Sequence, residues 1–260
     1  MIVTTAGRTN EKLKKLASNI AIDLNEEYIP RQKVSIQSIQ QLTKEDVLVV
    51  GKNRIELYMV SHNEPIFFHP NSSMFRIKRL LQGTYDPFVE ACKLDEGMTL
   101  LDCTVGLGSD SIIASYKVGH TGSVISIEAN QILAYLVQTG LKTWETDIPE
   151  MNDAMRRITL LHSNFQDYLK QCPSKSVDVI YFDPMFEEEL KHSQGISGIK
   201  ALAIYDTVTK HDIEEAVRVA RKRIVLKDHW KSERFDMLGF KPIRRKTASF
   251  HYGVIELENK

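Results

Sequence analysis

The chain has 260 residues, of which 42% are hydrophobic and 26% are charged. This length is enough for one full α/β domain with a smaller appended unit, and it exceeds that of a single small module. The formal net charge is +0 at pH 7, which argues against a protein that coats polyanions generally, although charges can still be segregated along the chain.

No stretch of the sequence is long and apolar enough to cross a membrane, and the first residues lack the apolar core of a signal peptide. We therefore expect a soluble, cytoplasmic protein with no membrane partner. The chain has 3 cysteines, Cys92, Cys103 and Cys172, which are odd in number and lack C-x-x-C spacing. Neither a disulfide framework nor a zinc site is expected, and the scattered histidines show no metal-binding spacing. No metal is predicted.

Residues 1–84 are predicted to form a small α/β subdomain. Segments with the composition of strands occur at Ile2–Thr5, Val47–Val50 and Ile55–Tyr58. Thr9 or Asn10 can cap a helix whose apolar residues recur at helical spacing up to Leu24. This part of the chain contains no catalytic constellation.

Aromatic and basic residues are interleaved in residues 67–81, around a helix start at Asn71 or Ser72. Stacking on bases combined with contacts to phosphates requires this mixture, although core packing beneath a basic outer face explains it equally well. The candidate substrate-binding residues in this segment are Arg76, Lys78 and Arg79. The C-terminal part is also basic, from Arg218 to Lys246, and the two groups together permit a nucleic-acid substrate.

Residues 85–260 are predicted to form the main domain, in which strands and helices alternate. Buried strands are expected at Thr99–Leu101, Ser123–Glu128, Ile158–Leu161, Val177–Phe182 and Ile224–Leu226, followed by a closing pair at residues 240–243 and 250–257. A helix is expected from His211 to Arg221, and the polar loop at residues 187–198 has the composition of a mobile lid. This alternation predicts a doubly wound, Rossmann-like α/β fold with a mostly parallel sheet and an antiparallel C-terminal hairpin.

The first strand of the main domain ends at Asp102 and continues into a turn that contains Gly106 and Gly108, after which a helix begins at Ser109. Such a turn places backbone N–H groups at the carboxyl end of a parallel sheet, where nucleotide-like ligands bind. Many glycine turns exist for steric reasons alone. The next strand, however, ends in Glu128, where a carboxylate can accept hydrogen bonds from ribose hydroxyls.

Two further strand ends carry polar groups: Ser163 and Asn164 follow the third strand, and Asp183 follows the fourth. The carboxyl ends of neighbouring parallel strands share one crevice, so Asn164 can read an adenine edge there. Asp183 and the carbonyl of Pro184 can both accept from an exocyclic amino group, while Phe186 stacks on the base. An Asp-Pro pair is also a common turn at the end of a strand.

The motif from Asp102 to Asp110, the acid Glu128 and the motif Tyr181–Phe186 resemble class I S-adenosylmethionine-dependent methyltransferases. Over roughly residues 70–255 the chain more closely resembles the bacterial family that methylates N2 of a guanine in small-subunit ribosomal RNA. The resemblance implies S-adenosyl-L-methionine as the cofactor and RNA as the partner, with Asp183, Pro184 and Phe186 as catalytic residues. It places the cofactor contacts on Ser109, Asp110, Glu128, Ala129, Ser163, Asn164 and Asp183, to which the turn contributes Asp102, Thr104, Gly106 and Gly108.

Two features depart from that family. Asn164 stands where the family commonly has an acid. The N-terminal part, with the segment Thr4–Asn10, resembles that of a Gram-positive branch, whose members are similar to the guanine enzymes in the catalytic domain only. Another RNA position, or another RNA or DNA base, therefore stays open. A nicotinamide-dependent dehydrogenase shares the glycine turn and the ribose acid, but Ser111 occupies the third glycine position of its motif. A non-catalytic RNA-binding assembly factor with the same fold is the third alternative.

Overall fold

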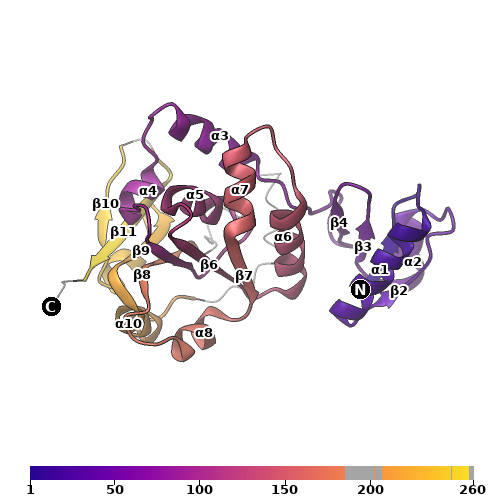
Figure 1. Ribbon diagram of the computed structural model, residues 1–260. Helices are drawn as coiled ribbons and strands as arrows, with labels where there is room; N and C mark the ends of the chain where they lie inside the picture. Colours follow the sequence, from indigo (N-terminus) through magenta and orange to yellow (C-terminus); the bar gives the residue numbers. More distant parts are fainter. Residues whose placement is uncertain (185–201, 203–206, 247, 258–260) are drawn as a thin grey trace.

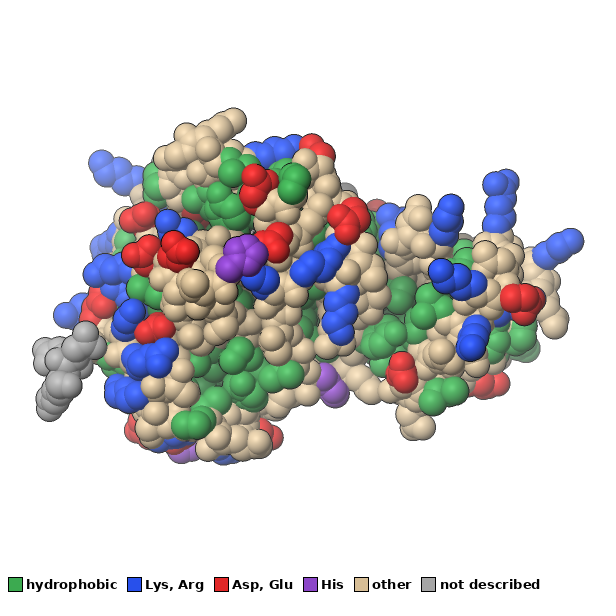
Figure 2. Space-filling model, viewed as in Figure 1, with side chains coloured by type: hydrophobic (Ala, Val, Ile, Leu, Met, Phe, Trp, Pro, Cys, Tyr) green, Lys and Arg blue, Asp and Glu red, His purple; other side chains and the backbone are tan. Residues whose placement is uncertain are grey.

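The computed structural model describes residues 1–184, 202, 207–246 and 248–257. In these residues the strands form two sheets, and Figure 1 shows a small unit that contains the N-terminus beside a larger one. Among the described helices, none combines the length and the apolar composition that crossing a membrane requires. On the face shown in Figure 2, charged side chains of both signs are interspersed over the larger unit, in keeping with a net charge of zero.

The small unit contains a four-stranded sheet with the order β2-β1-β3-β4. Its strands are β1 (Ile2–Thr5), β2 (Glu27–Tyr28), β3 (Val47–Val50) and β4 (Ile55–Tyr58). β1 is parallel to both β2 and β3, and β4 is antiparallel to β3. The helices are α1 (Glu11–Leu24) and α2 (Ile36–Thr43). Asn10 caps α1 by accepting from the N–H of Leu13 at 2.9 Å, as the sequence predicts, whereas α2 was not expected.

The large unit contains a seven-stranded sheet with the order β10-β11-β9-β8-β5-β6-β7. Its strands are β5 (Thr99–Asp102), β6 (Ser123–Glu128), β7 (Ile158–His162), β8 (Val177–Phe182), β9 (Ala220–His229), β10 (Lys241–Ile243) and β11 (Phe250–Glu256). Strands β5 to β9 pair in parallel, and β11 pairs antiparallel with both β9 and β10. The expected doubly wound sheet with an antiparallel C-terminal pair is therefore confirmed.

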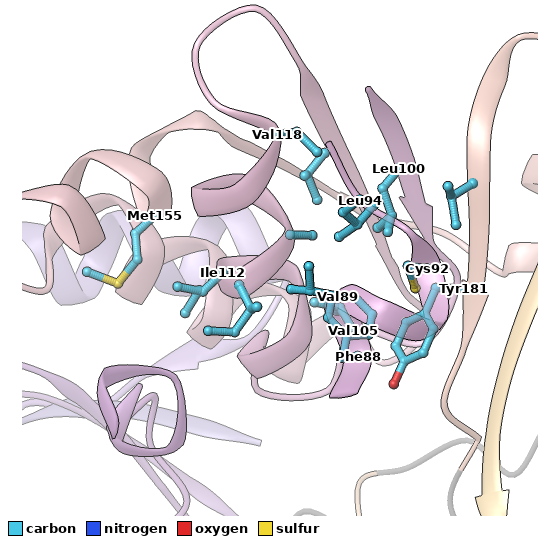
Figure 3. Packing of buried hydrophobic residues seen from close by; sticks show 14 of the residues in the cluster. Phe88, Val89, Cys92, Leu94, Leu100, Val105, Ile112, Val118, Met155 and Tyr181 are labelled. Atoms are coloured by element: carbon cyan, nitrogen blue, oxygen red, sulfur yellow. The ribbon is translucent and has the colours of Figure 1, made fainter. Parts of the chain in front are cut away.

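Helices cover both faces of the large sheet. They are α3 (Asn71–Leu81), α4 (Pro87–Cys92), α5 (Ser109–Val118), α6 (Gln131–Thr143), α7 (Pro149–Arg157), α8 (Phe165–Gln171), α10 (Lys210–Val219) and α11 (Arg234–Met237). One core is formed by α4 to α7 against the sheet, and α8 and α10 contribute to a second core. Figure 3 shows part of the first core, where the ring of Tyr181 lies edge-on to that of Phe88, with ring centroids 4.7 Å apart.

One helix boundary was predicted wrongly. The helix expected up to Arg221 ends earlier, and Arg221 lies in β9, which is also longer than the predicted strand. The side chain of Arg221 pairs with Asp178 at 3.1 Å, and the buried Arg223 pairs with Glu256. These ion pairs allow charged residues to lie in a strand. The charged composition of this segment therefore did not predict a strand.

Helix α6 contributes to the cores of both units. Leu133, Val137 and Leu141 pack in the core of the large unit. Ile132, Tyr135 and Leu136 pack against the core of the small unit, with Val3 and Leu48 among its members. The segment between the units also crosses over, because Phe68 packs in the large core whereas Ile66 packs in the small one. We propose that the boundary between the units lies between Ile66 and Asn71, rather than after residue 84, because α3 contacts α5.

We expect Gly140→Ala to destabilise the protein. An added Cβ at this position of α6 would lie 2.1 Å from Cγ of Phe68, which is buried. Alanine gains about 1 kcal/mol over glycine in a helix, but overpacking of a core costs about 1–3 kcal/mol and more where backbone must move. Urea unfolding should therefore show a lower free energy of unfolding. Gly7→Ala is the control, because its Cβ meets nothing within 4 Å.

Candidate active site

A cavity of about 1020 Å³ lies at the carboxyl edge of the large sheet. Its wall is built from the ends of β5, β6, β8 and β9, the turn after β5, the start of β11 and one side of α3. This is the edge at which open α/β sheets bind their ligands. Of the predicted strand-end residues, Asp102, Glu128 and Asp183 therefore converge on a single cavity, whereas Ser163 and Asn164 do not line it.

The turn after β5 forms the floor of this cavity. Gly106 and Gly108 both have a positive φ, +52° and +78°, and Gly108 is the residue that precedes α5. A Cβ at Gly106 would meet nothing within 4 Å, so its backbone faces open space and a ligand can approach it closely. Gly108 instead faces the side chain of Val137, which brings α6 against the turn.

Asp102 fixes the conformation of this turn. The residue is buried, and its carboxylate accepts from the N–H of Thr104 at 3.1 Å and from the hydroxyl of Ser111 at 2.5 Å. Burial raises the pKa of Asp102 to about 7, against the effect of these two hydrogen bonds. Its carboxylate thus holds the turn and the start of α5 together, and it also lines the cavity.

Glu128 ends β6 at the cavity wall. Its carboxylate accepts from the N–H of Asn130 at 2.9 Å, and burial raises its pKa although backbone N–H groups of Asn130, Gly106 and Ala129 oppose the shift. A buried carboxylate oriented by backbone donors suits two vicinal hydroxyls of a ribose, which are hydrogen-bond donors.

Asp183 directly follows β8 and is linked to the turn and to β9. Its N–H donates to the hydroxyl of Thr104 at 2.6 Å, and its carboxylate accepts from Nζ of Lys227 at 2.6 Å. Lys227 belongs to β9, and Pro184, the residue after Asp183, is buried in the cavity wall. Thr104 therefore fixes the backbone of Asp183, and Lys227 orients its carboxylate, at the point where β8 ends.

A buried charge network lies behind Asp183. Asp110 accepts from Arg76 at 2.5 Å and from the hydroxyl of Tyr181 at 2.7 Å, and its carboxylate lies 3.6 Å from Nζ of Lys227. Arg76 also forms two bonds with Asp86, at 2.8 and 2.9 Å. Burial disfavours the charge of Asp110, but Lys227 and Arg76 overcome this and hold its pKa well below the usual range. The two carboxylates in turn raise the pKa of Lys227 in spite of burial.

The structure brings most of the predicted site residues together. The cavity wall includes Asp102, Thr104, Gly106, Ser109, Asp110, Glu128, Ala129, Asp183, Pro184, Arg76 and Arg79. Gly108, Ser163, Asn164 and Lys78 lie outside this wall. Asn164 caps α8 by accepting from the N–H of Gln166 at 2.8 Å, and Lys78 pairs with Asp147 at 3.3 Å. Phe186 and the expected lid at residues 187–198 lie outside the described residues.

Sequence reasoning did not assign Lys227, Tyr181 and Asp86 to the site. Lys227 directly follows the apolar run Ile224–Leu226, and a cation at the carboxyl end of a buried strand is the signal that could have identified it. Tyr181 and Asp86 carry no such signal, because a strand tyrosine and a helix-capping aspartate are ordinary features.

The part of the cavity wall that α3 and the residues after β9 contribute is rich in cations. It includes Arg79, Lys231, Arg234, Arg245 and Phe250. Arg234 pairs with the buried Asp228 at 2.5 Å, and the guanidinium carbon of Arg245 lies 5.0 Å from the ring centroid of Phe250. Nη1 of Arg245 is buried and has no hydrogen-bond partner among the described residues. This wall suits an anionic ligand that also carries an aromatic face.

A family model described as "putative SAM-dependent methyltransferase" matches residues 31–243. The chain belongs to this family of SAM-dependent methyltransferases. It is 50% identical over 255 residues to the Bacillus subtilis "Uncharacterized protein YpiP", covering 98% of this chain and 99% of that one. The solved structure of the SAM-dependent methyltransferase NGO1261 from Neisseria gonorrhoeae superposes with a TM-score of 0.60 at 19% identity, over 98% of this chain and 96% of that chain, and so shares the fold.

Relatives with a named activity match over part of their length. The "Ribosomal RNA small subunit methyltransferase J" of Acinetobacter baylyi is 37% identical over 108 residues, which is 41% of this chain and 38% of that protein. The protein of the same name from Alteromonas mediterranea is 29% identical over 168 residues, 62% of this chain and 61% of the relative. These alignments cover less than two thirds of the named methyltransferases.

Because the chain belongs to a family of SAM-dependent methyltransferases, its cofactor is S-adenosylmethionine. The same match favours a methyltransferase over the two alternatives, a dehydrogenase and a non-catalytic factor. The cavity residues fit this cofactor, because Gly106 leaves its backbone open to a ligand and Glu128 offers a buried carboxylate that can accept hydrogen bonds from hydroxyl groups. Among the described residues no cluster of three or more His, Cys, Asp or Glu could hold a metal ion.

We expect Glu128→Ala to weaken S-adenosylmethionine binding. A hydrogen bond to a charged group contributes about 1.5–3 kcal/mol, which corresponds to roughly a 10- to 150-fold higher Kd. Titration calorimetry with S-adenosylmethionine and S-adenosylhomocysteine measures this change. Glu90→Ala, at an exposed position of α4, serves as the control and should bind like the wild type. Equal affinities of the two variants would remove the assigned role of Glu128.

Proposed function

We propose that this methyltransferase transfers a methyl group to the exocyclic N2 amino group of a guanine in small-subunit ribosomal RNA. The observation that carries this proposal is the position of Asp183. Asp183 lines the cofactor cavity, its backbone is bonded to the glycine turn through Thr104, and the same cavity wall contains several cations. The names of the partial relatives support ribosomal RNA as the substrate. Such a substrate places the enzyme in the cytoplasm.

In this proposal, bound S-adenosylmethionine supplies a methyl group activated by the positive charge of the sulfonium. The residues of the chain orient the acceptor and exclude water. The carboxylate of Asp183 and the carbonyl of Pro184 accept hydrogen bonds from the amino group, which localises a lone pair otherwise delocalised into the guanine ring. A carbon–nitrogen bond forms as the carbon–sulfur bond breaks, and the surplus proton on nitrogen leaves through Asp183 to solvent.

The test is transfer of a labelled methyl group from S-adenosylmethionine to unmodified small-subunit ribosomal RNA transcribed in vitro. Digestion to nucleosides and mass spectrometry should identify N2-methylguanosine. If a different methylated nucleoside is found, the protein is still an RNA methyltransferase, but the proposed target base is wrong. Labelling of DNA but not of RNA would overturn the proposed substrate class.

A further inference from the structure

The small sheet carries opposite charges at its two edges. Because β1, β2 and β3 are parallel, their carboxyl ends lie at one edge, from which β4 also begins. The cations at or next to this edge, here called the basic edge, are Arg8, Lys12, Arg31, Lys33, Lys52 and Arg54. At the opposite edge lie Asp23, Glu26, Glu27, Glu45 and Asp46, together with Lys44. A chain without net charge thus concentrates positive charge at one edge of its smaller unit.

Most cations of the basic edge are exposed to solvent, and one is held at the edge by hydrogen bonds to backbone carbonyls. Arg8, Lys33 and Lys52 are exposed, and Figure 2 shows Lys and Arg side chains projecting from the small unit. None of these three forms an ion pair with the described acids. The acids nearest to this edge already have partners, since Glu11 pairs with Lys14 at 2.7 Å and Glu56 pairs with Arg54 at 2.6 Å.

Arg31 is held at the edge by the backbone. Its Nη1 donates to the carbonyl of Thr5 at 3.2 Å, and its Nε donates to the carbonyl of Val34 at 2.5 Å. Carbonyl acceptors orient the guanidinium without neutralising its charge. The carboxyl end of β1 thus carries a cation in a fixed position.

A row of rings connects the basic edge to the active-site cavity. The guanidinium carbon of Arg54 lies 3.9 Å from the ring centroid of Phe67, and the rings of Phe67 and His69 are 5.4 Å apart, centroid to centroid. His69 belongs to the cavity wall, and its Nδ1 is buried without a hydrogen-bond partner among the described residues. The two surfaces are therefore continuous through side chains that offer stacking faces.

We propose that the basic edge binds the phosphates of the RNA strand that flanks the target nucleotide. This inference rests on the proposed function and adds a second contact region to it. Lys and Arg contacts with phosphates provide affinity and orientation without reading sequence. Rings between the edge and the cavity are suited to stack on unpaired bases, which is how proteins commonly hold single-stranded RNA. The substrate segment next to the target is accordingly single-stranded.

The test compares two variants of equal charge in the full-length protein. The test variant carries Arg8→Ala, Lys33→Ala and Lys52→Ala. The control variant carries Lys117→Ala, Lys142→Ala and Lys170→Ala, which are exposed residues of the large unit outside the two basic segments. Fluorescence anisotropy measures binding of a labelled small-subunit ribosomal RNA transcript at several salt concentrations. Steady-state methyl transfer gives kcat and KM for the same RNA, and calorimetry gives the affinity for S-adenosylmethionine.

We expect the test variant to bind RNA at least about tenfold more weakly, with a slope of log K against log salt reduced in magnitude by about 2. Its KM for RNA should rise while kcat and cofactor affinity stay at the values of the control. Equal RNA affinity and KM in the two variants would overturn the inference. Weaker binding to anionic lipid vesicles in the test variant, with RNA binding intact, would also overturn it. Absence of methyl transfer to RNA by the wild type would instead overturn the proposed function.

Discussion

Asp183→Ala is expected to lower kcat for methyl transfer about a hundredfold or more, because a lost orienting group at the reacting atoms costs this much in other enzymes. Binding of S-adenosylmethionine should change little, since Gly106 and Glu128 remain in the cavity wall. Lys227 keeps Asp110 as a partner, so the protein should stay folded. Rapid-quench measurement of methyl transfer at saturating cofactor and RNA separates the chemical step from binding.

Two further variants sharpen this result. Asp183→Asn keeps the shape and one carbonyl acceptor, so its kcat should lie between those of the wild type and Asp183→Ala. Asp167→Ala removes an exposed carboxylate of α8 and should behave like the wild type. Unchanged turnover of Asp183→Ala under saturating conditions would exclude the assigned role of the carboxylate.

Lys227→Met is expected to lower both stability and activity. The substitution leaves the carboxylates of Asp110 and Asp183 without the cation between them, and breaking a buried ion pair in this way costs about 3 kcal/mol or more. Activity should fall as well, because Asp183 loses the donor that orients it. Lys227→Arg keeps the charge and should recover part of both quantities. Urea unfolding and methyl-transfer rates provide the measurements.

The pH dependence of this loss has a definite sign. Lys227 and Arg76 hold the pKa of Asp110 below its unfolded value, so the stability gained from ionised Asp110 is present above about pH 4 and declines as the pH falls. The difference between wild type and Lys227→Met should therefore be largest between about pH 5 and pH 10 and decrease in acid. Lys117→Met, at an exposed position, should show no such difference. A loss of stability independent of pH down to pH 2 would argue against the electrostatic explanation.

Local patterns predicted the elements that carry their own signals. The apolar strand before Asp102, the positive-φ glycines after it and the cap at Asn10 all depend on residues close together in the sequence. Helix α7 was missed although Pro149 stands at its first turn, and Met151, Ala154 and Met155 form its buried face. The start of β9 was missed because Arg223 has its acidic partner 33 residues away, in β11.

In the candidate site, too, local patterns predicted some residues, whereas contacts between distant parts of the chain determine the others. The strand pattern placed Glu128 and Asp183 in one cavity wall, because parallel strands bring their carboxyl ends to one edge of the sheet. Asn164 was assigned to the cofactor from its position after a strand, but its side chain accepts from the first turn of α8. The pairing of Asp110 with Arg76 spans 34 residues and that with Tyr181 spans 71 residues. Such pairings follow from the packing of α3 and β8 against α5, which no local pattern encodes.

Helix α6 has a consequence for the integrity of the whole chain. One face of this helix closes the core of the large unit, and Leu136 on its other face closes that of the small unit. Opening either core removes apolar contacts from the helix that also supports the other, so the two units should gain and lose their structure cooperatively. The small unit should therefore not fold independently of the large unit. Through α6 it helps to stabilise the glycine turn and the active-site cavity.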